Sequence, residues 1–180
     1  MNHKGTAPLE TERLLLRRYT VEDAPAMYAN WASDPEVTRY LTWQPHANVE
    51  KTRKLLAEWV KEYEKPDYYS WGLELRQTGE LIGSLSVVHI DESIMEAELG
   101  WFICRRFWGQ GLMPEAVKAV IGYLFDAVGL DFILVGHFEW NRQSARVIEK
   151  CGFEYVRTIP YQTRCGTTEP SREYILYKGR

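Results

Sequence analysis

One continuous stretch, from Glu98 to Ala119, constrains the fold of this chain more than any other. Just before and within it, side chains alternate: Met95, Ala97, Leu99, Trp101 and Ile103 share one face, and Glu96, Glu98, Gly100 and Phe102 share the other. This period of two predicts a strand with one packed face and one face that carries two carboxylates. Pro114 and Glu115 suit the first turn of a helix, and apolar residues then recur at helical spacing. The stretch therefore predicts a strand, a short turn and a long amphipathic helix.

The turn between that strand and that helix, residues 108–113, contains Gly109 and Gly111. Two glycines let the backbone approach a ligand closely, and the start of a helix leaves several N–H groups unpaired. Such a turn favours an anion, and a phosphate in particular. An isolated Gly-x-Gly is more often an ordinary loop, so the functional interpretation depends on the rest of the pattern.

Three segments carry a resemblance to a known family. They are Glu98-Leu99-Gly100-Trp101, then Phe107-Trp108-Gly109-Gln110-Gly111-Leu112-Met113, then Asn141-x-x-Ser144 leading to Glu149-Lys150-Cys151-Gly152-Phe153. In this order the chain resembles the GNAT superfamily of acetyl-CoA-dependent N-acetyltransferases, and the resemblance runs from Leu9 to Phe153. Within the superfamily, the chain most resembles the ribosomal-protein N-terminal (RimJ/RimL-type) branch. Trp108 and Met113 depart from many superfamily members, but both are common in this branch.

The rest of the chain predicts further strands and helices. Strands are expected at residues 9–19, 69–76, 81–90, 132–138, 153–161 and 173–178, helices at 20–34, 48–63 and 141–151, and a polar loop at 163–171. This mixture predicts a three-layer α/β or α+β domain. The resemblance adds a mixed, twisted sheet of about seven strands with four helices. It also implies that the fourth and fifth strands, which end near Ile103 and Phe138, splay apart, and that the acyl donor lies between them.

Length, charge and cysteine content restrict the class of protein. A chain of 180 residues fits one domain, expected over residues 9–180 after a short polar tail of residues 1–8. A net charge of −3 gives no reason to expect a nucleic-acid partner. No apolar stretch suits a signal peptide or a membrane span, so no membrane partner is expected. Cys104, Cys151 and Cys165 have no metal-like spacing and are expected to be reduced thiols in a cytoplasmic protein.

The resemblance implies which residues hold acetyl-CoA. Backbone amides from Gly109 to Met113 would bind the pyrophosphate, and the strand end around Ile103 would bond the pantetheine arm. The full set of expected cofactor-binding residues is Ile103, Trp108, Gly109, Gln110, Gly111, Leu112, Met113 and Asn141, and no metal is expected.

Moving an acetyl group from a thioester to an amine requires a neutral amine, stabilisation of the carbonyl oxygen and release of the thiol. Glu98 is the candidate base, acting directly or through water; the alternative is a solvated or ion-paired strand carboxylate. Ser144 is the candidate acid for the departing thiolate; the alternative is an ordinary first-turn residue behind an Asn141 helix cap. His137 lies in an apolar strand and is expected to be structural. Cys104 and Cys151 are expected to be packing residues.

The expected activity is direct transfer of an acetyl group from acetyl-CoA to a primary amine. An α-amine with a pKa of about 8 is roughly a tenth neutral at pH 7, whereas a lysine amine, near 10.4, is neutral below about one part in a thousand. The branch favours a protein N-terminal α-amine, such as that of a ribosomal protein. A small-molecule amine (polyamine, amino acid or drug) and a non-catalytic acyl-CoA sensor stay open as alternatives. The oligomeric state also stays open, with a homodimer among the alternatives.

A nucleotide-binding domain of the Rossmann type is disfavoured by the residues of the turn. Gly109 and Gly111 are followed by Met113 and Pro114 instead of a third glycine.

Overall fold

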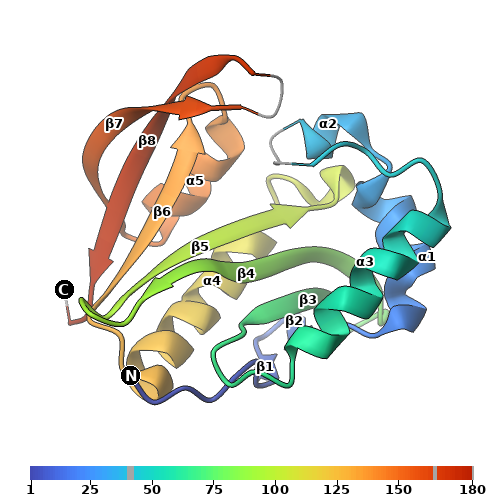
Figure 1. Ribbon diagram of the computed structural model, residues 1–180, viewed down its shortest axis with the longest axis horizontal. Coiled ribbons are helices and arrows are strands. Elements are labelled where there is room, and N and C mark those ends of the chain that lie inside the picture. Colours follow the sequence, from blue (N-terminus) through green and yellow to red (C-terminus); the bar gives the residue numbers. More distant parts are fainter. Residues whose placement is uncertain (40–42, 164–165, 180) are drawn as a thin grey trace.

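A single mixed sheet forms the centre of the protein (Figure 1). The computed structural model describes residues 1–39, 43–163 and 166–179. The strands are β1 (Leu9–Glu10), β2 (Leu14–Arg17), β3 (Ser70–Leu75), β4 (Leu81–Asp91), β5 (Glu96–Ile103), β6 (Phe132–Phe138), β7 (Glu154–Gln162) and β8 (Thr168–Tyr177). Their spatial order is β1-β2-β3-β4-β5-β6-β8-β7, and among the paired strands of the described residues only β5 and β6 are parallel. The predicted mixed α/β sheet is confirmed.

Helices cover both faces of this sheet (Figure 1). They are α1 (Ala24–Met27), α2 (Pro35–Thr38), α3 (Val49–Glu62), α4 (Leu112–Tyr123) and α5 (Arg142–Lys150). Beneath α4 and α5 lies a hydrophobic cluster that includes Leu99, Val117 and Ile133. A second cluster beneath α1 and α3 includes Trp31 and Leu56. No helix among the described residues is long and apolar enough to cross a bilayer.

Three elements differ from the sequence expectation. The single strand expected at residues 9–19 is divided into β1 and β2, because the Thr11 amide donates to the Leu14 carbonyl at 2.9 Å and closes a turn. The helix expected at residues 20–34 is interrupted by a π-helical turn at residues 28–32. Strand β8 begins at Thr168, within the predicted polar loop. Its first residues pair with β7 at the edge of the sheet, where polar side chains are solvated and leave no apolar alternation.

The polar residues 1–8 lie along the domain and are held by it. The Asn2 amide donates to the Val128 carbonyl at 2.8 Å, and the Gly5 amide donates to the Pro66 carbonyl at 2.7 Å. Thr6 is buried, and its hydroxyl accepts from the Ser70 amide at 2.9 Å. Backbone and hydroxyl groups therefore hold this segment, and the Met1 side chain also packs against the hydrophobic core.

Strands β5 and β6 separate where the family resemblance implied a splay. Their pairing runs from Glu96 opposite Phe132 to Leu99 opposite Val135 and ends there, although both strands continue. The Cys104 amide donates to the Ile82 carbonyl at 2.7 Å on the β4 side. Because backbone groups alternate in direction along an antiparallel strand, those of Trp101 and Ile103 face the side of β6. We call the space between the two strands beyond Leu99 and Val135 the opening.

Candidate functional site

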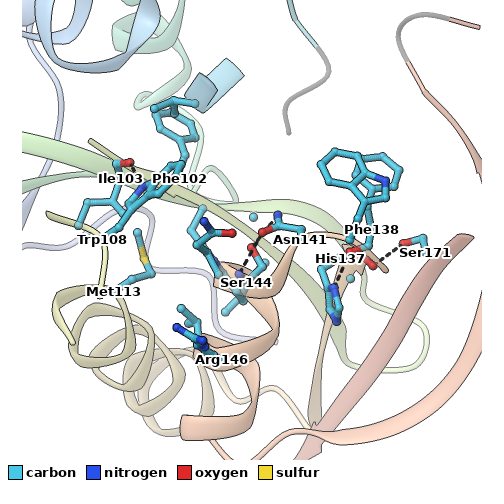
Figure 2. A pocket seen from close by; sticks show the side chains of 18 of the residues that line it. Phe102, Ile103, Trp108, Met113, His137, Phe138, Asn141, Ser144, Arg146 and Ser171 are labelled. Atoms are coloured by element: carbon cyan, nitrogen blue, oxygen red, sulfur yellow. Dashed lines mark hydrogen bonds between the residues drawn. The ribbon is translucent and has the colours of Figure 1, made fainter. Parts of the chain in front are cut away.

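A cavity of about 650 Å³ occupies the opening between β5 and β6. Its walls come mainly from four parts of the fold: β5, the start of α4, one side of α5, and the face formed by β6, β8 and β7; Val37 of α2 and Val88 of β4 also line it. Figure 2 shows side chains from these parts turned toward a common space. The cavity therefore joins segments that are far apart in the sequence.

The turn at residues 108–113, which we call the phosphate turn, has the backbone that its glycines predict. Gly109 and Gly111 both have φ of +77°, a conformation that L side chains adopt only at a cost. Gly111 directly precedes α4, and Pro114 in its first turn has no N–H to satisfy. Among the described residues, the amides from Gly109 to Met113 donate to no protein acceptor. Five donors therefore remain at the positive end of a helix.

Arg13, which does not line the cavity, stabilises this turn through hydrogen bonds that were not predicted from the sequence. Its Nε donates to Oε2 of Glu115 at 2.7 Å, and its Nη1 donates to the Gln110 carbonyl at 3.0 Å. The Thr11 hydroxyl donates to Oε1 of the same glutamate at 2.6 Å. The turn between β1 and β2 is thus fastened to the first turn of α4.

Gln110 is the one expected cofactor residue that does not line the cavity. Its side-chain Nε2 donates to the Arg106 carbonyl at 2.8 Å, and its own carbonyl accepts from Arg13. Gln110 therefore contributes side-chain and carbonyl bonds that shape the phosphate turn.

Trp108 connects the phosphate turn to the end of β5. Its indole Nε1 donates to the Ile103 carbonyl at 2.9 Å, as Figure 2 shows. The Ile103 carbonyl is therefore occupied, while the Ile103 amide faces the opening. Leu112 and Met113 are buried and line the cavity beside Trp108.

Asn141 and Ser144 form one hydrogen-bonded pair at the start of α5. Oδ1 of Asn141 accepts from the Ser144 amide at 3.2 Å, and Nδ2 donates to the Ser144 hydroxyl at 3.1 Å (Figure 2). Asn141 is thus the helix cap, and both residues also line the cavity. The two interpretations offered by the sequence for Asn141 are compatible with each other.

Arg146 and Lys150 of α5 follow the Asn141 cap and line the same wall. Residues four apart in a helix share a face, so both cations lie on the cavity side of α5. Sequence reasoning missed them, although their spacing after Asn141 was visible. They add positive charge to the end of the cavity that holds the phosphate turn.

Glu98 lines the cavity from β5, opposite Leu134 of β6. Burial raises the pKa of Glu98, and the nearby charge of Glu173 raises it further. Glu98 makes no salt bridge with a described residue. A half-buried carboxylate with a raised pKa binds a proton more tightly than an exposed one, which suits a general base.

His137, Cys104 and Cys151 lie near the site in states that suit packing. Nδ1 of His137 lies 2.7 Å from the Phe138 carbonyl, its ring stacks on Tyr174, and burial lowers its pKa. Burial raises the pKa of Cys104 and raises that of Cys151 to about 11, so both are protonated thiols near neutral pH. Cys165 lies outside the described residues.

These features define a class of protein. Amide donors and two cations at one end of an opened parallel strand pair suit a ligand with a diphosphate, and a carboxylate farther along suits proton transfer. The fold and the cavity are those of an acyl-CoA-dependent transferase.

The particular family follows from comparison with known proteins. Residues 13–154 match the family model described as an acetyltransferase (GNAT) domain, so the chain belongs to the GNAT family of N-acetyltransferases and uses acetyl-CoA as its donor. It is 33% identical to the uncharacterized N-acetyltransferase YoaA of Bacillus subtilis, over 96% of this chain and 97% of that protein. The resemblance drawn from the sequence is confirmed.

Two solved structures support the same fold. The ribosomal-protein-S5-alanine acetyltransferase from Vibrio fischeri has a TM-score of 0.83 and 18% identity, over 96% of this chain and 97% of that chain. RimL, a ribosomal L7/L12 alpha-N-protein acetyltransferase solved with coenzyme A, has a TM-score of 0.84 and 18% identity, over 95% of this chain and 98% of that chain. At these identities the likeness concerns the fold alone.

Proposed function

We propose that this N-acetyltransferase moves the acetyl group of acetyl-CoA directly to the N-terminal α-amine of a protein or peptide. The observation that carries the proposal is the charge distribution along the cavity. Amide donors of the phosphate turn lie at one end with Arg146 and Lys150, and Glu98 lies with Glu169 and Glu173 at the other. An anionic donor and a cationic amine would therefore bind at opposite ends of one cavity.

At the positive end, the phosphate turn would hold the pyrophosphate of acetyl-CoA. Backbone amides at a helix start bind phosphate oxygens well, and Arg146 and Lys150 would pair with the remaining phosphate charge. The Ile103 amide faces the opening, beyond the last residue that pairs with β6, and would donate a hydrogen bond to the pantetheine arm. The thioester would then lie between β5 and β6, close to Glu98.

Glu98 would act as the general base in this proposal. The incoming ammonium loses a proton to Glu98, directly or through a water molecule, and the neutral nitrogen attacks the thioester carbonyl. A C–N bond forms, the C–S bond breaks and the nitrogen releases its second proton as the amide forms, so the acetyl group passes to the amine in one transfer. The raised pKa of Glu98 brings its affinity for a proton closer to that of an α-amine.

Ser144 would supply the proton that the departing thiolate needs and would take up in return the second proton that the acetylated nitrogen releases. Its hydroxyl lines the cavity and is held by Nδ2 of Asn141, which donates to it and leaves the hydroxyl proton free to be donated elsewhere. A Coenzyme A thiol leaves more easily as RSH than as RS⁻ near neutral pH. Asn141 would then act as a positioning residue for Ser144.

The preference for an α-amine rests on its ionisation. An α-amine with a pKa of about 8 loses its proton far more readily than a lysine near 10.4, and a single carboxylate base is adequate for it. The two solved ribosomal-protein acetyltransferases share the fold and are consistent with this acceptor class. The test has to distinguish a protein N-terminal α-amine from the alternative acceptor, a small-molecule amine.

The test is transfer from isotopically labelled acetyl-CoA into a dialysed, chemically deacetylated cell extract, followed by mass spectrometry of proteins and small molecules. Label on protein N-termini supports the proposal. Label confined to small amines or to lysine side chains overturns the acceptor class. Binding of acetyl-CoA without release of CoA thiol, with the extract and with a broad panel of purified amines, would point to a sensor and overturn catalysis.

A further inference from the structure

The face formed by β6, β8 and β7 lines the cavity with aromatic rings and carboxylates. Resting on the proposed function, we propose that this face is an acceptor subsite, which prefers acceptors whose first residue has an apolar or aromatic side chain and rejects those whose first residue is acidic. We call the surface the acceptor face; it comprises Gly136, Phe138, Tyr161, Glu169, Ser171 and Glu173.

The strand register places these residues on one side of the sheet. Gly136 lies opposite Glu173, and Phe138 lies opposite Ser171, across the β6–β8 ladder. Tyr161 lies opposite Glu169 across the β7–β8 ladder. Since residues opposite each other in a ladder point to the same face, the members form one continuous surface. All of them line the cavity.

Aromatic rings make one wall of this surface. Phe138 and Trp140 stack in parallel with centroids 5.2 Å apart, and Tyr161 meets Phe138 edge-on at 5.5 Å. Trp140 is 39% exposed and Tyr161 is 42% exposed, which leaves much apolar surface in contact with the cavity. An apolar side chain placed against these rings would remove that surface from water.

The floor of the surface is open because residue 136 is glycine. A Cβ atom built there would have its nearest neighbour, Oγ of Ser171, at 3.6 Å, which is an ordinary contact. Packing therefore does not demand a glycine at this position, and its exposed surface leaves room above β6. The space lies between Glu98 on one neighbouring strand and Glu173 on the other.

Carboxylates on this surface favour a positively charged group on the acceptor over a negatively charged one. Glu98, Glu169 and Glu173 all line the cavity, and Glu173 also accepts from Nε of Arg157 at 2.5 Å. A protonated amine is attracted to this group, whereas a second carboxylate on the first residue would be repelled. Arg39, whose guanidinium lies 5.3 Å from the Trp140 ring centre, is the competing cation at the rim.

The experiment uses peptides of one length that differ only in the first residue, which is Phe, Leu, Ala or Glu. The measured quantity is kcat/KM for each peptide with saturating acetyl-CoA and the full-length protein. We expect values for the Phe and Leu peptides at least about tenfold above that for Ala and about a hundredfold above that for Glu. Equal values across the four peptides, or a preference for Glu that points to Arg39, would overturn the inference.

A matched pair of variants locates the effect on the acceptor face. Tyr161→Ala should reduce the Phe-to-Ala ratio of kcat/KM at least about fivefold and leave KM for acetyl-CoA unchanged. Tyr155→Ala is the control, because Tyr155 is 56% exposed on the same strand but lies opposite Tyr174, on the other side of the sheet. An unchanged ratio in Tyr161→Ala, or an equal change in both variants, would contradict the assignment.

The outcomes separate this inference from the proposed function. If no peptide is acetylated although acetyl-CoA binds, the proposed function fails. If all peptides are acetylated without regard to the first residue, the proposed function stands and the assignment of the acceptor face fails.

Discussion

Arg13 and Glu115 meet across more than a hundred residues of sequence, with both Nε and Nη2 of the arginine 2.7 Å from the same carboxylate oxygen. The contact joins the turn after β1 to the first turn of α4. Since Arg13 also donates to the Gln110 carbonyl, it fixes two sides of the phosphate turn at once. The shape of the phosphate turn therefore depends on a residue that does not line the cavity.

Arg13→Ala should weaken acetyl-CoA binding without removing a catalytic group. We expect KM for acetyl-CoA to rise about tenfold, equivalent to roughly 1.4 kcal/mol, with a smaller change in kcat. Arg53→Ala is the matched control, since the Arg53 side chain has similar exposure and pairs with Glu50 on α3. Steady-state kinetics with varied acetyl-CoA measure the effect, and an unchanged KM in Arg13→Ala would contradict it.

Glu115 should make the stability of the protein depend on pH. Burial acts to raise the pKa of Glu115, but the hydrogen bonds from Thr11 and Arg13 outweigh it and hold the pKa below its usual value. A lowered folded pKa stabilises the fold above the unfolded value of about 4.3 and loses this contribution as pH falls through the folded pKa. Glu115→Gln should therefore cost about 1 kcal/mol at pH 7 and progressively less below about pH 4. Urea unfolding of wild type and Glu115→Gln at pH 7 and below about pH 4 measures the difference in stability. A loss of stability that is the same at both pH values would contradict this role of Glu115.

Glu98→Gln should lower kcat/KM by about a hundredfold, because the variant cannot accept a proton. In the wild type the rate should rise with pH as Glu98 ionises, and burial together with Glu173 places this rise at higher pH than for an exposed glutamate. Removing the neighbouring charge in Glu173→Gln should move the rise to lower pH. Profiles of kcat/KM against pH are measured for both proteins with the same acceptor, so that ionisation of the amine affects both equally. Identical profiles for wild type and Glu173→Gln would show that the charge of Glu173 does not affect Glu98.

Gly111→Ala should damage the phosphate turn through backbone strain alone. The nearest atom to an added Cβ is Nη2 of Arg13 at 3.6 Å, so space is available, but φ is +77°. We expect a loss of about 1–2 kcal/mol in stability and a smaller rise in melting temperature on adding acetyl-CoA. Gly122→Ala lies inside α4 with open space around its Cβ, and should instead stabilise by roughly 0.5–1 kcal/mol. Thermal unfolding with and without acetyl-CoA tests both variants, and equal behaviour of the two would refute the strain argument.

Ser144→Ala and Asn141→Ala should have different signatures. Loss of the Ser144 hydroxyl should lower kcat about tenfold or more with little change in stability, if it protonates the thiolate. Loss of the Asn141 cap should cost about 1 kcal/mol of stability in addition to activity. Single-turnover rates combined with unfolding curves measure both quantities. A Ser144→Ala enzyme with wild-type turnover would remove Ser144 from the chemistry and leave it as part of the cap.

The sequence predicted those elements whose apolar pattern is regular. The alternation ending at Ile103 and the helical spacing after Leu112 placed β5 and α4 correctly, whereas the opening between the ends of β5 and β6 was implied by the family resemblance. Local patterns of this kind are strong because burial on one face repeats with the period of the backbone.

Contacts between distant segments could not be predicted in the same way. The salt bridge of Arg13 with Glu115 depends on a turn between two very short strands, and neither strand has a distinctive pattern. The early start of β8 was missed because Glu169 and Pro170 resemble loop residues, although each pairs with β7. The aromatic wall joins β6 and β7, and the order of strands in the sheet was needed to bring Phe138 and Tyr161 together.

The early end of the β5–β6 ladder also divides the sheet into two halves. Strands β1 to β5 form one half, and β6, β8 and β7 form the other, joined in the sheet by only four paired residues on each strand. A ligand that contacts both banks of the opening acts as a cross-link between them, and its binding energy adds to the stability of the whole domain. The free energy that holds the two halves of the sheet together therefore increases when substrate is bound and decreases when it leaves.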